Sequence, residues 1–584
     1  MSFNSKNLVK LEISALRSQR WYAPDTIRAF AHRQRTQQSG LNRNEFMGKP
    51  VIGIINTWSE MSPCHSHLRE RAKAIKRAVW ASGGYPVELP ALSVGEVLVK
   101  PTTMLYRNFL AMETEELLRQ HPIDGAVLLG GCDKSTPALL MGAISMDLPI
   151  IFCPAGPMSS GKWHGQITGA GTHTKKFWDQ LRLGAITQHD WIELESAMTR
   201  SIGTCNTMGT ASTMTSIADA IGFTLPGASS IPAADSRHEQ MAAQCGQTIV
   251  DMVWYDHKPS RWLNRDNFLN GIVAYMALGG STNAAIHMIA MANRAGITLT
   301  LEDMASIARE VPVLANLFPS GDQLMEEFFF AGGLMAQLKK VEKFLSLDAI
   351  GVTNHSVSNW ISNAVCYDDN VIRSLDNPVV PLSQGCALTV LRGNLCPNGA
   401  VMKSSAAKPE LRFHKGPAIV FDSHQELSER IDDPALEVTK DSVLILRNAG
   451  PVGAPGMPEW GNLPIPKKLL QQGVTDMVRI SDARMSGTHY GTCILHVAPE
   501  AAIGGPLALV HTGDIIELDI ANNSLNVLVS EEELAERRRH LKPVHNIYQR
   551  SYAALYQQHV TQADQGCDFD FLQAGSTVPE PPIY

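Results

Sequence analysis

Short apolar runs alternate with helical stretches between about residues 50 and 300, and this alternation constrains the fold more than any other feature of the chain. VIGIINT (51–57), DGAVLLGG (124–131) and LPIIFCPAG (148–156) have the composition and length of buried strands. HLRERAKAIKRAVWASGG (67–84) has the apolar spacing of a helix and ends in a glycine pair. Strands and helices that alternate in this way predict an α/β fold with a largely parallel sheet.

The pattern of apolar and turn residues changes after about residue 380. ALTVLRGNL, PAIVFD, DSVLILRNAG, DIIELDI and SLNVLVS are β-rich segments separated by Gly, Pro, Asn and Asp turns, a pattern typical of a β domain or barrel. The polar, turn-rich stretch 367–385 is the predicted boundary. A chain of 584 residues is also long enough for two or three domains.

The charge and the N-terminus exclude some classes of partner. The formal net charge is −7 and no block of Lys and Arg stands out, so a nucleic-acid partner is not expected. The N-terminus lacks the apolar core of a signal peptide, and no apolar run is long enough to span a bilayer. We expect a soluble, cytoplasmic protein without a membrane partner.

Ten cysteines are present, and none forms a CxxC pair. A zinc ribbon, a thioredoxin-type site and a bacterial ferredoxin cluster therefore lack their usual signature. In a long chain without a secretion signal, the cysteines do not indicate a disulfide framework either.

Three of the cysteines lie in Gly- or Pro-rich turns that we predict to follow strands: Cys64, Cys132 and Cys205. Ligand sites in open α/β sheets gather at the carboxyl ends of strands, so these turns can converge. Three thiolates can hold an iron–sulfur cluster and leave one iron without a cysteine, free to act as a Lewis acid. The alternative is that these cysteines are buried small apolar residues, as most free cysteines are.

Five further polar residues in predicted loops are candidates for the same site. GGCDKST is not a phosphate-binding loop, because Asp133 occupies the place of the glycine that must precede the lysine. Asp133 and Lys134 therefore lie beside Cys132, and Glu96 and Glu459 lie in other loops. Each of these four residues, taken alone, could be either a solvated loop residue or a ligand. Ser486 in RISDARMSGTHYG does not lie in a G-x-S-x-G elbow, and an ordinary turn serine is the alternative.

Together these segments resemble a known family, that of the dihydroxy-acid and phosphogluconate dehydratases, and within it the sugar-acid branch typified by L-arabinonate and D-xylonate dehydratases. The resemblance runs nearly end to end. It rests on NTWSEMSPCHSHL, PTTMLYRN, GGCDKSTP, GTCNTMGTASTM, GGSTNA, LRGNLCPNGAVMKSSA, GPVGAPGMPE, RISDARMSGT and APEAAIGGPLA.

The resemblance implies a role for each candidate residue. Cys64, Cys132 and Cys205 would ligate a [2Fe-2S] cluster, although some relatives carry [4Fe-4S]. Mg²⁺ would be bound by Glu96, Asp133, Glu459 and Lys134, the lysine carrying a CO₂-derived carbamate that makes it an anionic oxygen ligand. Ser486 would be the catalytic base.

The resemblance also implies the architecture. Residues 1–380 would form an α/β/α domain that carries the cluster and most Mg²⁺ ligands, and residues 381–584 a β-barrel domain that carries Ser486 and one Mg²⁺ ligand. The chain would assemble as a homodimer or homotetramer.

The implied function is that of a hydro-lyase converting a sugar acid, such as L-arabinonate, D-xylonate, D-fuconate or D-gluconate, into its 2-keto-3-deoxy acid. One alternative is a dihydroxy-acid dehydratase acting on 2,3-dihydroxyisovalerate; another is a non-catalytic iron–sulfur sensor on the same fold. Residues 161–178 and 556–572 look like the sugar-acid branch. We see no basic cluster for a phosphorylated substrate, unless scattered Lys and Arg residues meet in space.

Overall fold

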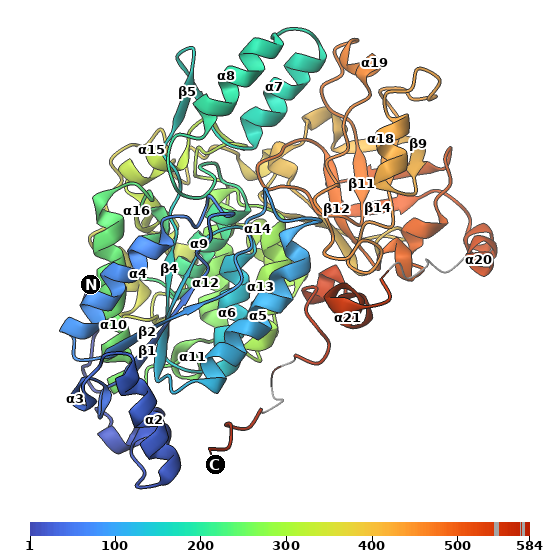
Figure 1. Cartoon of the computed structure of the whole chain (residues 1–584). Coiled ribbons are helices and arrows are strands. Elements are labelled where there is room, and N and C mark those ends of the chain that lie inside the picture. The colour runs from blue at the N-terminus through green and yellow to red at the C-terminus, as the bar shows by residue number, and fades with distance from the viewer. Residues whose placement is uncertain (542–547, 573, 575–577, 584) are drawn as a thin grey trace.

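The computed structural model describes residues 1–541, 548–572, 574 and 578–583, and it contains two large sheets, each with its own apolar core (Figure 1). The first sheet has four parallel strands in the order β2-β1-β3-β4. Its strands are β1 (Val51–Asn56), β2 (Tyr85–Pro90), β3 (Gly125–Gly130) and β4 (Ile150–Pro154). The predicted parallel sheet is confirmed, although the sequence analysis did not identify β2.

Helices cover both faces of this sheet (Figure 1). α4 (Leu68–Ala81) packs with α10 (Ser236–Trp254) on one face, and α5 (Thr103–Gln120) packs with α6 (Ser135–Met146) on the other. This is the arrangement that right-handed crossovers between parallel strands produce. A further layer packs on α6: α9 (Thr210–Ile221), α12 (Arg265–Leu278) and α13 (Asn283–Arg294). Because both faces are covered, β1, β3 and β4 are buried along their whole length and read as continuous apolar runs.

The second sheet has eight strands in the order β14-β13-β9-β10-β11-β12-β8-β7. β9 to β12 are parallel to one another, and the flanking strands are antiparallel. Leu525 N donates to Arg392 O at 2.8 Å, which brings β14 against the end of β7 and nearly closes the sheet. The predicted barrel is therefore confirmed. The strands are β7 (Thr389–Leu391), β8 (Gly399–Met402), β9 (Phe413–Phe421), β10 (Val443–Leu446), β11 (Arg479–Ser481), β12 (Cys493–Ala498), β13 (Ile515–Asp519) and β14 (Ser524–Val527).

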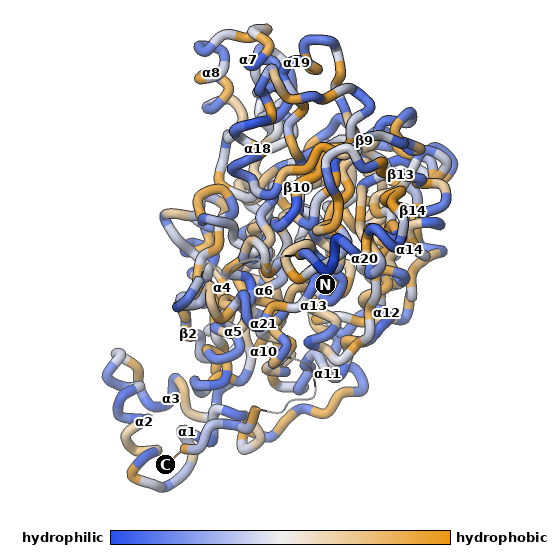
Figure 2. Tube along the Cα trace, turned by 90° about the vertical axis from the view of Figure 1, so that its right-hand side faces the viewer, coloured by the Kyte–Doolittle hydropathy of each residue, from blue (hydrophilic) through white to orange (hydrophobic). Residues whose placement is uncertain are grey.

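Strand β10 divides the core of the second domain into two layers. Val443 and Ile445 face the interior of the nearly closed sheet, whereas Leu444 and Leu446 face the outside. The outer layer is covered by α18 (His424–Arg430) and α19 (Lys467–Leu470). In Figure 2 β10 accordingly runs as a hydrophobic strand through the second domain.

The remaining elements are short or peripheral. They are α1 (Gln19–Tyr22), α2 (Ile27–Gln38), α3 (Arg43–Phe46), β5 (Gly161–Trp163), β6 (Gln166–Thr168), α7 (Thr172–Arg182), α8 (Gln188–Met198), α11 (Pro259–Trp262), α14 (Leu301–Ala308), α15 (Met325–Phe330), α16 (Gly333–Lys340), α17 (Val357–Ile361), α20 (Glu531–Arg539) and α21 (Ser551–His559). Within the described ranges, no helix combines the length and the apolarity that a membrane crossing requires.

The C-terminal segment returns from the barrel to the first domain. Arg107 on α5 donates to the carbonyl oxygens of Gly566 and Cys567 at 2.9 and 2.8 Å. Farther along, Arg294 on α13 pairs with Asp568 at 2.6 Å, and both side chains are buried. The last described residues, 578–583, lie beside α1 and α2 (Figures 1 and 2). The domain boundary at residue 380 stays a prediction.

We predict that Asp568→Ala destabilises the protein by about 3–5 kcal/mol, because it leaves the buried Arg294 guanidinium without its closest counter-ion. Asp570→Ala is the matched control: Asp570 lies in the same segment but is exposed, and His559 is its one ion-pair partner among the described residues, so the substitution should cost less than about 1 kcal/mol. Urea denaturation followed by circular dichroism measures both. Equal losses of stability in the two variants would contradict a stabilising role for the Arg294–Asp568 ion pair.

Candidate functional site

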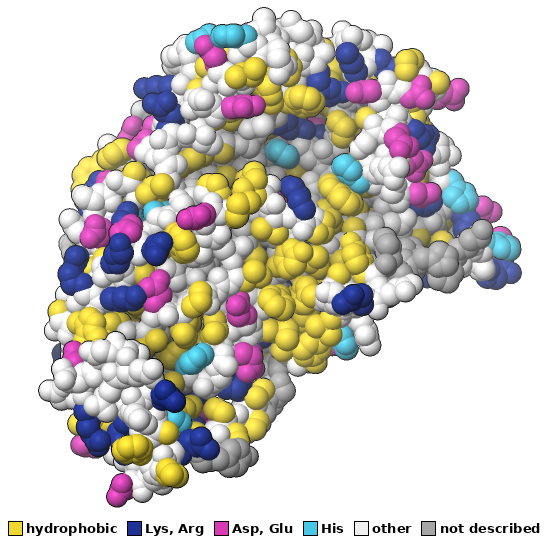
Figure 3. Space-filling view, in the orientation of Figure 1, with side chains coloured by type: hydrophobic (Ala, Val, Ile, Leu, Met, Phe, Trp, Pro, Cys, Tyr) yellow, Lys and Arg dark blue, Asp and Glu magenta, His cyan; other side chains and the backbone are white. Residues whose placement is uncertain are grey.

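One cavity of about 670 Å³ lies where loops after β1 and β3 face loops of the second domain. Its volume is in the range of small-molecule sites. The space-filling view shows this face of the molecule hollowed below α7 and α8 (Figure 3). Seven of the eight predicted site residues line the cavity: Cys64, Glu96, Cys132, Asp133, Cys205, Glu459 and Ser486. The eighth, Lys134, is buried and contacts three of them.

The three cysteines come from three different loops of the first domain. Cys64 lies between β1 and α4, Cys132 follows β3, and Cys205 precedes α9. The predicted strand before Cys205 is wrong: residues 199–203 are irregular, and Thr204 makes only an isolated bridge with Pro157. The thiols nevertheless share one cavity, because the loop that carries Cys205 is held beside β4 by this bridge.

The environment of the thiols disfavours thiolates unless a cation is near. The hydrogen bond with Cys132, together with burial, raises the pKa of Cys64, while burial and the nearby Asp133 raise the pKa of Cys205. None of the ten cysteines forms a disulfide. Three convergent free thiols without a fourth fit an iron–sulfur cluster in which one iron has no cysteine ligand, and its positive charge would stabilise the thiolates.

Buried His65 holds the loop of Cys132 and was missed by the sequence analysis, although it directly follows Cys64. Its Nε2 accepts a hydrogen bond from Cys132 N at 3.0 Å. Burial and the nearby His67 lower the pKa of His65 to about 3, so the ring is neutral and can act as this acceptor.

Lys134 lies among three carboxylates that we call the acidic cage: Glu96, Asp133 and Glu459. Its Nζ is 3.1, 3.3 and 3.2 Å from their respective oxygens. Burial and Arg484 lower the pKa of Lys134, but the three carboxylates outweigh them and raise it. Three carboxylates thus face two cations, Lys134 and Arg484, and the excess negative charge fits the oxygen-ligand chemistry of a divalent cation such as Mg²⁺.

Glu459 brings the second domain into the acidic cage. Arg484 donates to its Oε1 at 2.9 Å, and Asn283 of the GGSTNA segment donates to the same oxygen at 2.8 Å. Although burial would raise the pKa of Glu459, Lys134 and Arg484 lower it to about 2, so this carboxylate is ionised. Arg484 also donates to Thr102 Oγ1 of the first domain at 3.0 Å, which ties the two domains together at the cage.

Ser486 reaches the cavity from the loop after β11. Its Oγ lies 2.9 Å from Thr488 Oγ1, and Thr172 at the start of α7 donates to Thr488 O at 2.5 Å. A Cβ at Gly487 would lie only 2.4 Å from Ser281 Cβ. A glycine after Ser486 is thus required for close approach to the first domain, a reason that the sequence alone did not reveal.

A second part of the cavity wall, which we call the basic end, is basic and aromatic, and the sequence analysis missed it; its arginines pair with carboxylates outside the acidic cage. Lys175, Trp178 and Arg182 of α7 line it, together with Trp191 and Arg479. The alternative left open by the sequence, that scattered Lys and Arg residues meet in space, is therefore the one observed: these side chains come from two domains and meet only in the fold.

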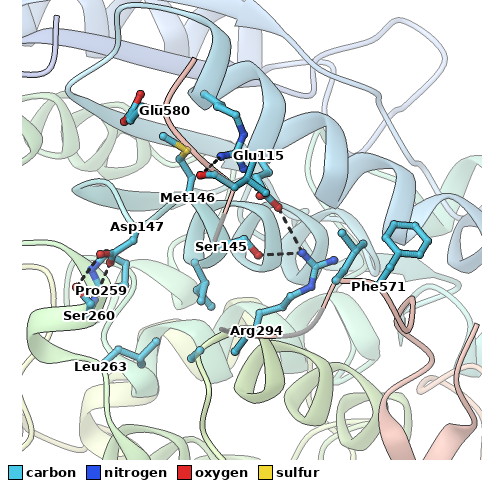
Figure 4. Close-up of a pocket in the computed structure, with 16 residues that line it drawn as sticks. Glu115, Ser145, Met146, Asp147, Pro259, Ser260, Leu263, Arg294, Phe571 and Glu580 are labelled. Carbon is cyan, nitrogen blue, oxygen red and sulfur yellow. Dashed lines mark hydrogen bonds and ion pairs between the residues drawn. The ribbon is translucent and has the colours of Figure 1, made fainter. Parts of the chain in front are cut away.

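A second cavity, of about 460 Å³, contains none of the predicted site residues (Figure 4). Its arginines are paired: Arg119 with Glu115, and Arg294 with Asp568 and, at 3.6 Å, with Glu115. The lining has no cysteine or histidine among the described residues. Its charges thus serve to hold the C-terminal segment, and we assign it no chemistry.

Family models match both parts of the chain. The model described as dihydroxy-acid/6-phosphogluconate dehydratase N-terminal matches residues 49–360, and the corresponding C-terminal model matches residues 370–567.

Curated relatives match nearly end to end. A 6-deoxy-6-sulfo-D-gluconate dehydratase of Pseudomonas putida is 72% identical, over 98% of this chain and 99% of that protein. An L-arabinonate dehydratase of Rhizobium leguminosarum bv. trifolii is 48% identical, over 96% of each chain. A dihydroxy-acid dehydratase of Caldicellulosiruptor saccharolyticus is 36% identical, over 90% of this chain and 95% of that protein.

Proposed function

Because this chain belongs to the dihydroxy-acid/6-phosphogluconate dehydratase family, we propose that it dehydrates a sugar acid to the 2-keto-3-deoxy acid. The chain is a dehydratase, as its relatives are. The observation that carries the proposal is the meeting of three thiols, the acidic cage and Ser486 in one cavity. The expected assembly as a homodimer or homotetramer and the cytoplasmic location remain predictions.

A sugar acid is favoured over 2,3-dihydroxyisovalerate for two reasons. The relatives named as sugar-acid dehydratases are more similar to this chain than the one named dihydroxy-acid dehydratase. The basic end of the cavity also carries Lys175 and Arg182, which suit a polar tail better than an isopropyl group. Within the aldonates, we propose 6-deoxy-6-sulfo-D-gluconate as the preferred substrate, because the relative named for it is 72% identical.

The residues present fit two inorganic groups. Cys64, Cys132 and Cys205 would hold an iron–sulfur cluster, of the [2Fe-2S] type with [4Fe-4S] as the alternative, and the acidic cage would hold Mg²⁺. When bound, these groups supply Lewis acidity toward the leaving hydroxyl and toward the carboxylate of the substrate.

We further propose that Lys134 carries a carbamate. An ammonium group would repel Mg²⁺, whereas a carbamate adds an anionic oxygen to the three carboxylates around Nζ. The ammonium must first lose a proton; the neutral amine then adds to the carbon of CO₂ and loses a second proton, so the charge at Lys134 changes from +1 to −1.

Ser486 would take the proton from C2 of the substrate. Its hydroxyl is normally too weak an acid, so the alkoxide requires nearby positive charge and hydrogen-bond donors. Thr488 Oγ1, 2.9 Å away, can donate one such hydrogen bond. Loss of the C3 hydroxyl then gives an enol, and tautomerisation to the 2-keto acid returns a proton to C3, so the net loss is one water.

We predict that Ser486→Ala keeps the visible absorption of the purified protein but lowers kcat by about 10²–10⁴-fold, the usual effect of losing a general base. Ser428→Ala, an exposed serine on α18, should leave both unchanged. Substantial turnover by Ser486→Ala would rule out this residue as the base.

Cys132→Ser should lose both visible absorption and turnover, because a serine hydroxyl is a poor ligand for iron. Cys366→Ser is the control, since Cys366 lies outside the cavity. Retention of the absorption spectrum in Cys132→Ser would contradict the proposed cluster ligands.

Exhaustive treatment with EDTA should abolish turnover, and added Mg²⁺ should restore it, because a Mg²⁺ ion held by a few carboxylate oxygens exchanges with solution. Glu96→Gln should weaken this recovery by removing one carboxylate. Full activity after verified removal of divalent metal would contradict a Mg²⁺ site.

A substrate panel tests the proposed function itself. Anaerobically purified protein is assayed with Mg²⁺ for 2-keto acid formation from 6-deoxy-6-sulfo-D-gluconate, D-gluconate, L-arabinonate, D-xylonate and 2,3-dihydroxyisovalerate. We expect turnover of aldonates and little turnover of dihydroxyisovalerate. Activity confined to dihydroxyisovalerate would overturn the sugar-acid proposal.

A further inference from the structure

Helix α7 forms the wall of the cavity that spans the two domains. In Figures 1 and 2, α7 and α8 lie together beside α19 of the second domain. The start of α7 is fixed by Thr172, which donates to Thr488 O near Ser486. Its end is fixed by Arg182, which pairs with Asp432 at 3.0 Å and donates to Ile465 O at 3.4 Å. The helix therefore runs from the predicted base toward the basic end of the cavity.

One face of α7 points into the cavity. The lining residues at the start of the helix and along it follow a spacing of three and four: Gly171, Thr174, Lys175, Trp178, Asp179 and Arg182. On the opposite face, Phe177 packs against Leu194 and Met198 of α8. This packing fixes the rotation of the helix, so the cavity-facing side chains are placed by the core beneath them.

Lys175 differs from the other cations at this end of the cavity. Arg182 is paired with Asp179 and Asp432, and Arg479 with Asp476. The Nζ of Lys175 has no carboxylate within 4.0 Å and no hydrogen-bond partner among the described residues. Burial and the nearby Arg479 lower the pKa of Lys175 to about 8, although Cys493, Asp179 and Asp476 oppose this change. No acceptor in the described part of the chain contacts its Nζ directly, so an anion in the cavity would stabilise its charge.

His489, which also lines the cavity, carries a second polar group without a hydrogen-bond partner among the described residues. Nδ1 of His489 is buried and forms no hydrogen bond with the described residues. Burial and the charge of Lys175 lower the pKa of His489 to about 4, and Glu459 opposes this change. His489 thus lies within electrostatic reach of both the acidic cage and Lys175, between the reacting end and the basic end.

We propose that Lys175 binds the anionic group at the end of the substrate remote from C2 and C3, and so selects aldonates with a charged oxyanion on C6. This inference rests on the proposed function and adds to it a residue that determines specificity. A hydroxymethyl end leaves Lys175 unpaired, whereas a sulfonate or phosphate offers oxygen acceptors for charge-assisted hydrogen bonds. A single unpaired cation matches the single charge of a sulfonate better than the double charge of a phosphate.

The test compares two substrates on one preparation of each variant. For Lys175→Met we expect KM for 6-deoxy-6-sulfo-D-gluconate to rise by about 10- to 100-fold, the usual effect of losing a hydrogen bond to a charged group. KM for D-gluconate should change by less than about threefold, since no ion pair is lost. Lys175→Arg, which keeps the charge, should restore most of the preference. Lys176→Met removes the exposed neighbouring lysine and should leave both values unchanged.

The ratio of kcat/KM for the two substrates does not depend on how much of a preparation is active, so it stays informative if Lys175→Met folds poorly. If Lys175→Met leaves the ratio of the two kcat/KM values unchanged, because both fall equally or neither falls, the role of Lys175 is overturned. A wild-type protein that prefers D-gluconate would overturn it as well, and one that prefers 6-phospho-D-gluconate would assign the site to phosphate instead of sulfonate. Inactivity of the wild type on every aldonate would instead contradict the proposed function.

Discussion

The pairing of charges around Lys134 is the constraint on which the rest of the site depends. A buried charge is costly unless it is paired, and Lys134 takes two carboxylates from its own domain but the third, Glu459, from the other. Arg484 completes the arrangement by contacting Glu459 and Thr102. Lys134 and Arg484 contact Glu459 in one arrangement of the domains, and that arrangement also brings Ser486 into the cavity of the thiols.

Much of the fold could be predicted because its signals are local. β1, β3 and β4 are buried on both faces, so each appears in the sequence as a continuous apolar run. β2 was missed because it is a partly exposed edge strand with prolines at its second and last positions. The strand expected before Cys205 is absent. This glycine-containing segment is instead held by an isolated bridge between Thr204 and Pro157, and a contact between residues about fifty positions apart leaves no local signal in the sequence.

The residues of the site also differ in how far the sequence could predict them. Cys64, Cys132 and Asp133 follow strands whose ends must meet, so physical reasoning could bring them together. Glu459 and Ser486 were assigned only through resemblance, because no spacing rule connects residues in different domains. No sequence pattern marks Lys175, Arg479 and His489 as cavity residues. A lysine within a helix is usually exposed to solvent, and only the packing of Phe177 against α8 shows which face of α7 is turned toward the cavity.

The cavity takes its wall from residues as far apart in sequence as Cys64 and Tyr490. On the ribosome the chain emerges from its N-terminus, and domains fold in that order. The three thiols are therefore synthesised long before Glu459 and Ser486 exist to close the site around them. Until the second domain has folded, the thiols face a half-built cavity that lacks Glu459, Ser486 and the wall that the second domain supplies.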